Sequence, residues 1–114
     1  MVFNIYVIEL DKKVLEDKKF KQANPGYIKG KPCVYVGCTS LTPEERYQKH
    51  ITGARNKKGP LYNKYAKNFG TRLKPRLYKT HNPMSSRKQA EDMEKEKARR
   101  LKKRGYGVWP NFKN

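Results

Sequence analysis

The chain has 114 residues, of which 28 are lysine or arginine and 10 are acidic, so its formal net charge is +18 at pH 7. This length is enough for one domain with a modest core and excludes two domains, so we treat 1–114 as a single unit. The charge favours a polyanionic partner, with nucleic acid as the first candidate. The alternative is a basic surface that only maintains solubility.

Other protein classes are excluded by what the sequence lacks. No apolar run is long enough to span a bilayer, and the N-terminal MVFNIYVIEL has no basic residues that would open a signal peptide. The two cysteines, Cys33 and Cys38, form no zinc-binding spacing with His50 and His81. We therefore expect a cytoplasmic protein with reduced cysteines, no membrane association and no small-molecule cofactor.

Two segments rich in β-branched and aromatic residues, 2–10 and 33–36, predict strands. They pair most simply as an antiparallel hairpin with a long connection. This connection, at 11–32, is a charged and turn-rich insertion with room for a short helix at 13–20. The second strand is expected to stop at Gly37.

Side-chain alternation divides the residues of these strands between two faces. Val34 and Val36 share one face of the second strand, and Ile5 and Val7 share one face of the first. If these four residues are in the core, then Tyr6 and Tyr35 lie together on the opposite face.

A helix with a strong start signal follows, over 43–52. Thr42 suits the N-cap, Pro43 suits the first helical position, and Glu45 completes a capping box. Arg46 and His50 are four residues apart and therefore share one face of this helix.

The next segment, 53–70, is basic with interleaved aromatic residues, and it predicts a helix over 60–68 that stops at Gly70. The helical spacing of its aromatic residues favours core packing over base stacking. Residues 72–79 predict a short strand, which Pro75 should confine to an edge or to its start. Weaker candidates for nucleic-acid contacts in this region are Lys57, Lys58, Lys64 and Arg72.

The last helix should begin with a capping box of Ser86 and Gln89 and end at Gly105, and the tail after it should close the fold as a strand-like segment. Glu94 falls inside its apolar stripe, which is formed by Ala90, Met93, Ala98 and Leu101. A carboxylate in such a stripe is costly unless it forms an ion pair or binds a metal. An ion pair with Lys97 or Arg46 and a functional role are equally compatible with the pattern.

The candidate catalytic residues are Tyr6, Tyr35, Arg46, His50 and Glu94. Such a set could hydrolyse a phosphodiester. Glu94 would hold one divalent cation, Arg46 would neutralise charge on the phosphoryl oxygens, and a tyrosine or a water that it orients would supply the nucleophile.

These residues resemble the GIY-YIG nucleases over most of the chain, from Ile5 to about Asn111. Asn4-Ile5-Tyr6 stands for Gly-Ile-Tyr, and Tyr35-Val36-Gly37 stands for Tyr-Ile-Gly. Arg46 with His50 one turn later, and Glu94 ahead of Gly105-Tyr106, match the remaining positions. The resemblance implies an α+β fold with a small three-stranded antiparallel sheet flanked by helices. It also implies cleavage that depends on Mg²⁺ or Mn²⁺ and leaves a 5′-phosphate and a 3′-hydroxyl.

The chain departs from the family pattern in four places. Asn4 replaces the first glycine, the insertion at 11–32 is long, and Cys38 stands where many members carry a basic or hydroxyl residue. Gly107 replaces an asparagine, with Asn111 nearby as a substitute and as a further weak candidate for a nucleic-acid contact. We expect no separate DNA-binding domain, so specificity should come from the chain's own surface or from a protein partner, or be weak.

The sequence thus predicts a metal-dependent endonuclease acting on nucleic acid, with DNA as the first candidate. The main alternative is a non-catalytic basic nucleic-acid-binding module on the same fold. A structural protein of a ribonucleoprotein particle is a further one.

Overall fold

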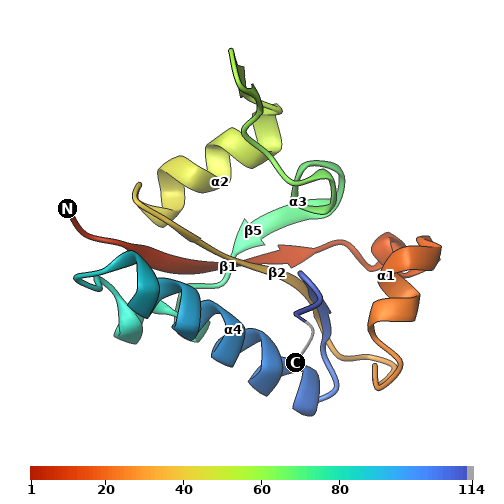
Figure 1. Cartoon of the computed structure of the whole chain (residues 1–114). Coiled ribbons are helices and arrows are strands. Elements are labelled where there is room, and N and C mark those ends of the chain that lie inside the picture. Colours follow the sequence, from red (N-terminus) through yellow and green to blue (C-terminus); the bar gives the residue numbers. More distant parts are fainter. Residues whose placement is uncertain (113–114) are drawn as a thin grey trace.

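A four-stranded mixed sheet forms the centre of the computed structural model, which describes residues 1–112 (Figure 1). The spatial order of the strands is β5-β1-β2-β6. β1 pairs antiparallel with β2 and with β5, whereas β6 runs parallel to β2. The strands are β1 (Asn4–Leu10), β2 (Cys33–Thr39), β5 (Gly70–Leu73) and β6 (Gly107–Trp109).

The α+β fold class is confirmed. The sheet is not the three-stranded antiparallel one that the resemblance implies, because the segment after the last helix joins β2 as a parallel fourth strand. The prediction of a strand-like closing segment is confirmed for residues 107–109.

Helices cover both faces of the sheet: α2 and α3 lie on one side and α4 lies on the other (Figure 1). Since helices cover both faces of the sheet at its centre, β1 is buried at every position from Ile5 to Ile8. The helices are α1 (Lys18–Ala23), α2 (Pro43–Thr52), α3 (Lys64–Phe69) and α4 (Arg87–Lys103), with single 3₁₀ turns at Lys12–Glu16, Pro75–Leu77 and Lys79–His81. No helix within residues 1–112 is long and apolar enough to cross a bilayer.

The antiparallel β1–β2 hairpin is confirmed, but β2 runs to Thr39, beyond its predicted end. Gly37 does not terminate the strand. It lies opposite Tyr6 in the register, and a Cβ added to Gly37 would lie 2.4 Å from the Tyr6 hydroxyl oxygen. The glycine is therefore needed because the Tyr6 side chain occupies the space where its own side chain would be.

The start of α2 is as predicted, and both halves of the capping box between Thr42 and Glu45 are present. In α4 the Ser86 side chain accepts from the Gln89 N–H, but the Gln89 side chain accepts from Ser85 rather than from Ser86. The helix ends as expected, with Gly105 at φ +89° and its N–H bonded to the Lys102 carbonyl.

Two predicted elements are displaced. The helix expected over 60–68 begins only at Lys64, because the Asn63 side chain caps it. The strand expected over 72–79 occupies Gly70–Leu73 instead. Pro75 lacks the N–H that a sheet ladder requires, and the chain turns there into a 3₁₀ helix.

The insertion covers the outer edge of the sheet. Its expected short helix is split at Asp17, whose carboxylate accepts from the Phe20 N–H and caps α1. The buried side chain of Asn24 then donates to the Val108 carbonyl and accepts from the Val108 N–H, as a neighbouring strand would. The insertion thereby shields the polar groups of β6, which would otherwise form an open edge.

Candidate active site

Three elements bring the aromatic part of the predicted site together on the face of the sheet that α2 covers. Tyr6 comes from β1, Tyr35 from β2 and His50 from α2. The two tyrosine rings have centroids 6.1 Å apart, and the His50 ring lies 5.9 Å from Tyr6 and 5.2 Å from Tyr35. The expectation that the two tyrosines share a face is confirmed.

The hydrogen bonds of His50 determine its tautomer. Its Nδ1 accepts from the backbone N–H of Asn63 at 2.9 Å, and its Nε2 lies 2.9 Å from the Tyr6 hydroxyl oxygen. Burial and, to a lesser extent, the charge of Arg46 together lower the pKa of His50 to about 4, so the ring is neutral at pH 7. A neutral ring that accepts at Nδ1 carries its proton on Nε2, and His50 therefore donates to Tyr6.

The two phenols are electrostatically linked. Burial raises the pKa of Tyr6 well above its ordinary value and also raises the pKa of Tyr35. Hydrogen bonding between the two hydroxyls raises the pKa of Tyr6 further, whereas it lowers the pKa of Tyr35. A proton held by Tyr6 and directed at the Tyr35 oxygen would produce this pair of shifts.

Arg46 adds positive charge beside the phenols. It lies on α2 one turn before His50, and its guanidinium Nη1 donates to the Leu61 carbonyl. It lowers the pKa of both Tyr6 and Tyr35, so it acts on the same two hydroxyls. The side chain is half-buried, and no carboxylate within residues 1–112 forms an ion pair with it.

Glu94 approaches from the opposite layer, on α4. β6 pairs only with Cys33–Tyr35, so within residues 1–112 the edge of β2 opposite β1 has no partner strand beyond Tyr35. Glu94 lies next to Cys38 on this stretch. Burial raises the pKa of the half-buried Glu94 carboxyl, while hydrogen bonding to Cys38 lowers it. Burial and the Glu94 charge together raise the pKa of Cys38 to about 12.

Neither ion pair considered for Glu94, with Lys97 or with Arg46, is formed within residues 1–112. The Glu94 charge instead raises the pKa of Tyr35 and of Tyr6. Among the charged groups, Glu94 has the largest effect on Tyr35, whereas Arg46 has the larger effect on Tyr6.

The donor set suits one kind of metal site. Within residues 1–112 no three histidine, cysteine or acidic side chains cluster as a closed metal site would require. Mg²⁺, however, usually retains several waters and is bound by one or two carboxylates together with substrate phosphates. A half-buried carboxylate without an ion-pair partner, as at Glu94, fits such an open site.

The weaker candidates lie outside this cluster. Lys57 and Lys58 are exposed at the tip of a small β-ribbon, and the Lys64 ammonium lies 5.0 Å from the centroid of the Tyr65 ring. Arg72, on the edge strand β5, forms an ion pair with Glu9 at 2.6 Å. Asn111 accepts a hydrogen bond from the Lys102 ammonium. Lys102 follows Glu94 by eight residues on α4 and hence lies about 12 Å from it along the helix.

Two groups of the site were not predicted from the sequence. They are the Asn63 N–H, which donates to His50, and the Leu61 carbonyl, which accepts from Arg46. Both are backbone groups, which every residue carries, so no sequence pattern marks them.

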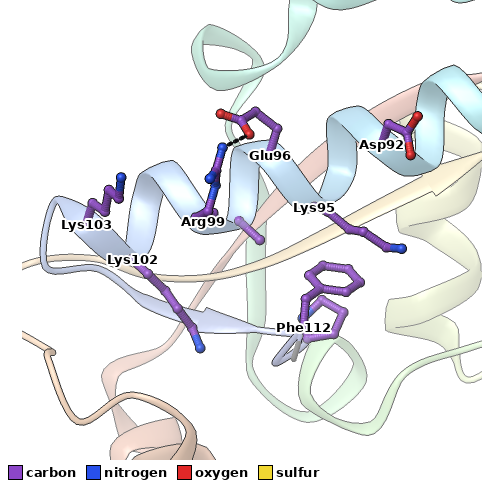
Figure 2. Close-up of a pocket in the computed structure, with 9 residues that line it drawn as sticks. Asp92, Lys95, Glu96, Arg99, Lys102, Lys103 and Phe112 are labelled. Atoms are coloured by element: carbon purple, nitrogen blue, oxygen red, sulfur yellow. Dashed lines mark hydrogen bonds and ion pairs between the residues drawn. The ribbon is translucent and has the colours of Figure 1, made fainter. Parts of the chain in front are cut away.

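The predicted residues do not line the cavity beside α4. This cavity of about 560 Å³ lies between α4 and the C-terminal segment, and Figure 2 shows Lys95 above Phe112 and the ion pair of Arg99 with Glu96. Glu94 is not among its lining residues, although its neighbour Lys95 is. The cavity therefore opens on a different side of α4 from the phenols.

Comparisons with protein-family models, with curated proteins and with solved structures find no match to this chain. What the chain can do therefore has to be inferred from the side chains that it brings together.

Proposed function

We propose that this protein is a divalent-cation-dependent endonuclease of the GIY-YIG type that hydrolyses phosphodiester bonds, with DNA as substrate. The observation that supports this most is that a guanidinium from one layer and a carboxylate from the other both act on two phenols, and that this carboxylate has no ion-pair partner within residues 1–112. A surface with a net charge of +18 attracts the polyanionic substrate to this site.

In this proposal, water attacks the phosphorus and the bond to the 3′ oxygen breaks, so the products are a 5′-phosphate and a 3′-hydroxyl. Arg46 neutralises the charge that develops on the phosphoryl oxygens. Its bond to the Leu61 carbonyl uses one of several N–H donors and leaves the others for the substrate.

Tyr35 is the phenol that we assign to receive the proton of the attacking water. It is half-buried, whereas Tyr6 is only 1% exposed and its oxygen already accepts from His50. His50 directs its N–H toward the Tyr6 oxygen, and Tyr6 directs its hydroxyl hydrogen toward the Tyr35 oxygen. Both residues therefore act through Tyr35. Tyr6 and His50 are therefore positioning residues.

Tyr35 can accept a proton only as a phenolate. Burial and the negative charge of Glu94 oppose this form, whereas Arg46 and the hydrogen bond from Tyr6 favour it. Mg²⁺ or Mn²⁺ held by Glu94 would polarise a phosphate oxygen and stabilise the leaving group. Neutralising Glu94 would also remove the largest charge that opposes the phenolate of Tyr35.

The test is to incubate the protein with supercoiled plasmid, single-stranded DNA and branched DNA, with and without Mg²⁺ or Mn²⁺. We expect nicking that EDTA abolishes and that Glu94→Gln loses. Binding without cleavage under all these conditions would instead identify a nucleic-acid-binding module on this fold. A preference for RNA together with unchanged behaviour of Glu94→Gln would favour a ribonucleoprotein component.

A further inference from the structure

A small β-ribbon stands between the helices α2 and α3. It is formed by β3 (Arg55–Asn56) and β4 (Gly59–Pro60), which are antiparallel and joined by Lys57 and Lys58. The ribbon is the green segment at the top of Figure 1, where it projects away from the sheet beyond the end of α2. All of its residues are exposed except Gly59, so packing against the core does not explain why it is there.

All the charged residues in and around the ribbon are basic. Between residues 53 and 70 the chain has five basic residues and no acidic residue. Three of the five, Arg55, Lys57 and Lys58, belong to the ribbon and its tip, and none of the three forms an ion pair within residues 1–112. A projecting element whose cations are unpaired is suited to contact a polyanion.

The ribbon is directly connected to the candidate active site. Its base is closed by a hydrogen bond from the Leu61 N–H to the Ala54 carbonyl. The carbonyl of the same Leu61 accepts from Arg46, and the N–H of Asn63 donates to His50. The segment that immediately follows the ribbon thus positions two of the site residues. A polyanion bound by the ribbon would therefore have a fixed position relative to Arg46.

We infer that the ribbon at 55–60 inserts into the major groove of B-form duplex DNA and so sets the substrate class of the proposed nuclease. Two strands lie about 4.8 Å apart, and the major groove of B-DNA, about 12 Å wide, admits a two-stranded ribbon. The major groove of an A-form RNA duplex is too deep and narrow to be read by side chains. The inference rests on the proposed function for its link to cleavage, but the binding itself is independent of it.

The test measures binding by Glu94→Gln protein in EDTA, so that cleavage does not enter. The ligands are a DNA duplex of about two helical turns, the RNA duplex of the same sequence and the single DNA strand. The variant Arg55→Gln/Lys57→Gln/Lys58→Gln is compared with Lys18→Gln/Lys19→Gln/Lys21→Gln, which removes the same charge from exposed positions of α1.

We expect the ribbon variant to lose about 30-fold in affinity for duplex DNA, and its salt slope to fall by about 3, since each phosphate contact contributes about 0.9. The α1 variant should lose less than about threefold in affinity. The unmodified ribbon should favour the DNA duplex over the RNA duplex and the single strand by about tenfold. Equal losses in the two variants, or equal binding of the RNA duplex, would overturn the inference.

A second measurement leaves the protein unchanged. Methylation of guanine N7 places a methyl group in the major groove, and methylation of adenine N3 places one in the minor groove. We expect interference with binding at N7 and not at N3. Interference confined to N3, or absent at both, would contradict groove insertion even if the DNA is cleaved. Conversely, N7 interference without any cleavage would retain the ribbon's role and reject the nuclease.

Discussion

The Tyr6 hydroxyl oxygen lies 2.9 Å from Nε2 of His50, and it accepts the hydrogen bond that this N–H donates. The Asn63 N–H occupies Nδ1 and so excludes the other neutral tautomer. The hydroxyl hydrogen of Tyr6 is therefore free to point toward Tyr35, whose ring centroid lies 6.1 Å from that of Tyr6. This relationship makes His50 a hydrogen-bond donor to the phenol pair and not a base for it.

His50 should remain neutral well below its ordinary pKa of 6.5, because burial lowers its pKa to about 4. Between these values the unfolded chain binds a proton that the folded protein does not. His50 therefore costs no stability above pH 6.5 and destabilises the fold as the pH falls toward 4, by up to about 3 kcal/mol. Ring titration by NMR and urea unfolding across this range measure both effects. An apparent pKa near 6.5 would refute the assigned environment.

The two tyrosines should differ in their effect on cleavage. Tyr35→Phe removes the assigned proton acceptor and should lose about 10²–10⁴ in rate, whereas Tyr6→Phe should lose roughly tenfold. Because burial raises the pKa of Tyr35, kcat/KM should rise continuously with pH through neutrality. Tyr35→Phe should flatten this profile. A larger loss for Tyr6→Phe than for Tyr35→Phe would assign the base to Tyr6 instead.

Glu94→Gln should abolish cleavage while leaving DNA affinity unchanged. Burial raises the pKa of Glu94, so ionisation of this carboxyl destabilises the fold as the pH rises through its titration. The glutamine variant should therefore be at least as stable as the parent at pH 7. Glu91→Gln, at an exposed position of the same helix, is the matched control and should retain full activity. Undiminished cutting by Glu94→Gln would remove Glu94 from the mechanism.

Arg46→Ala should lower the cleavage rate by about 10²–10³, the usual cost of losing one donor to a developing oxyanion. Arg46→Lys retains the charge but not the planar fork, and we expect it to recover only part of this loss. Arg76→Ala, at an exposed position in the 3₁₀ turn at Pro75–Leu77, serves as the control. If single-turnover rates for Arg46→Ala fell by less than about threefold, the role of Arg46 would be structural.

Gly37→Ala tests the packing under the phenols. Its Cβ would lie 2.4 Å from the Tyr6 oxygen and 2.5 Å from the ring carbon that bears it, so the ring must move. We expect a loss of about 1–3 kcal/mol in unfolding free energy and reduced cleavage. Gly26→Ala meets nothing within 4 Å and should stay within about 0.5 kcal/mol. A stable and fully active Gly37→Ala protein would show that the position of Tyr6 is not needed.

Local sequence patterns were sufficient to predict an element where the residues of that element define it by themselves. Thr42, Pro43 and Glu45 predict the start of α2 because a helix cap is satisfied within one turn. The stripe that contains Glu94 is likewise visible from helical periodicity alone. Where pairing with a distant segment decides, prediction was wrong: β2 continues past Gly37 because Tyr6, from another strand, occupies the space above it.

By itself, the sequence determined the strong positive charge, the β1–β2 hairpin, the two capped helices and the identity of the five candidate side chains. Only the tertiary structure decided that the sheet has a parallel fourth strand, that His50 carries its proton on Nε2, and that Glu94 has no ion-pair partner within residues 1–112. The physical reason is that propensity and periodicity act over a few residues. Proton positions and the pKa values of buried groups depend instead on neighbours that are distant in the chain and on backbone groups that every residue shares.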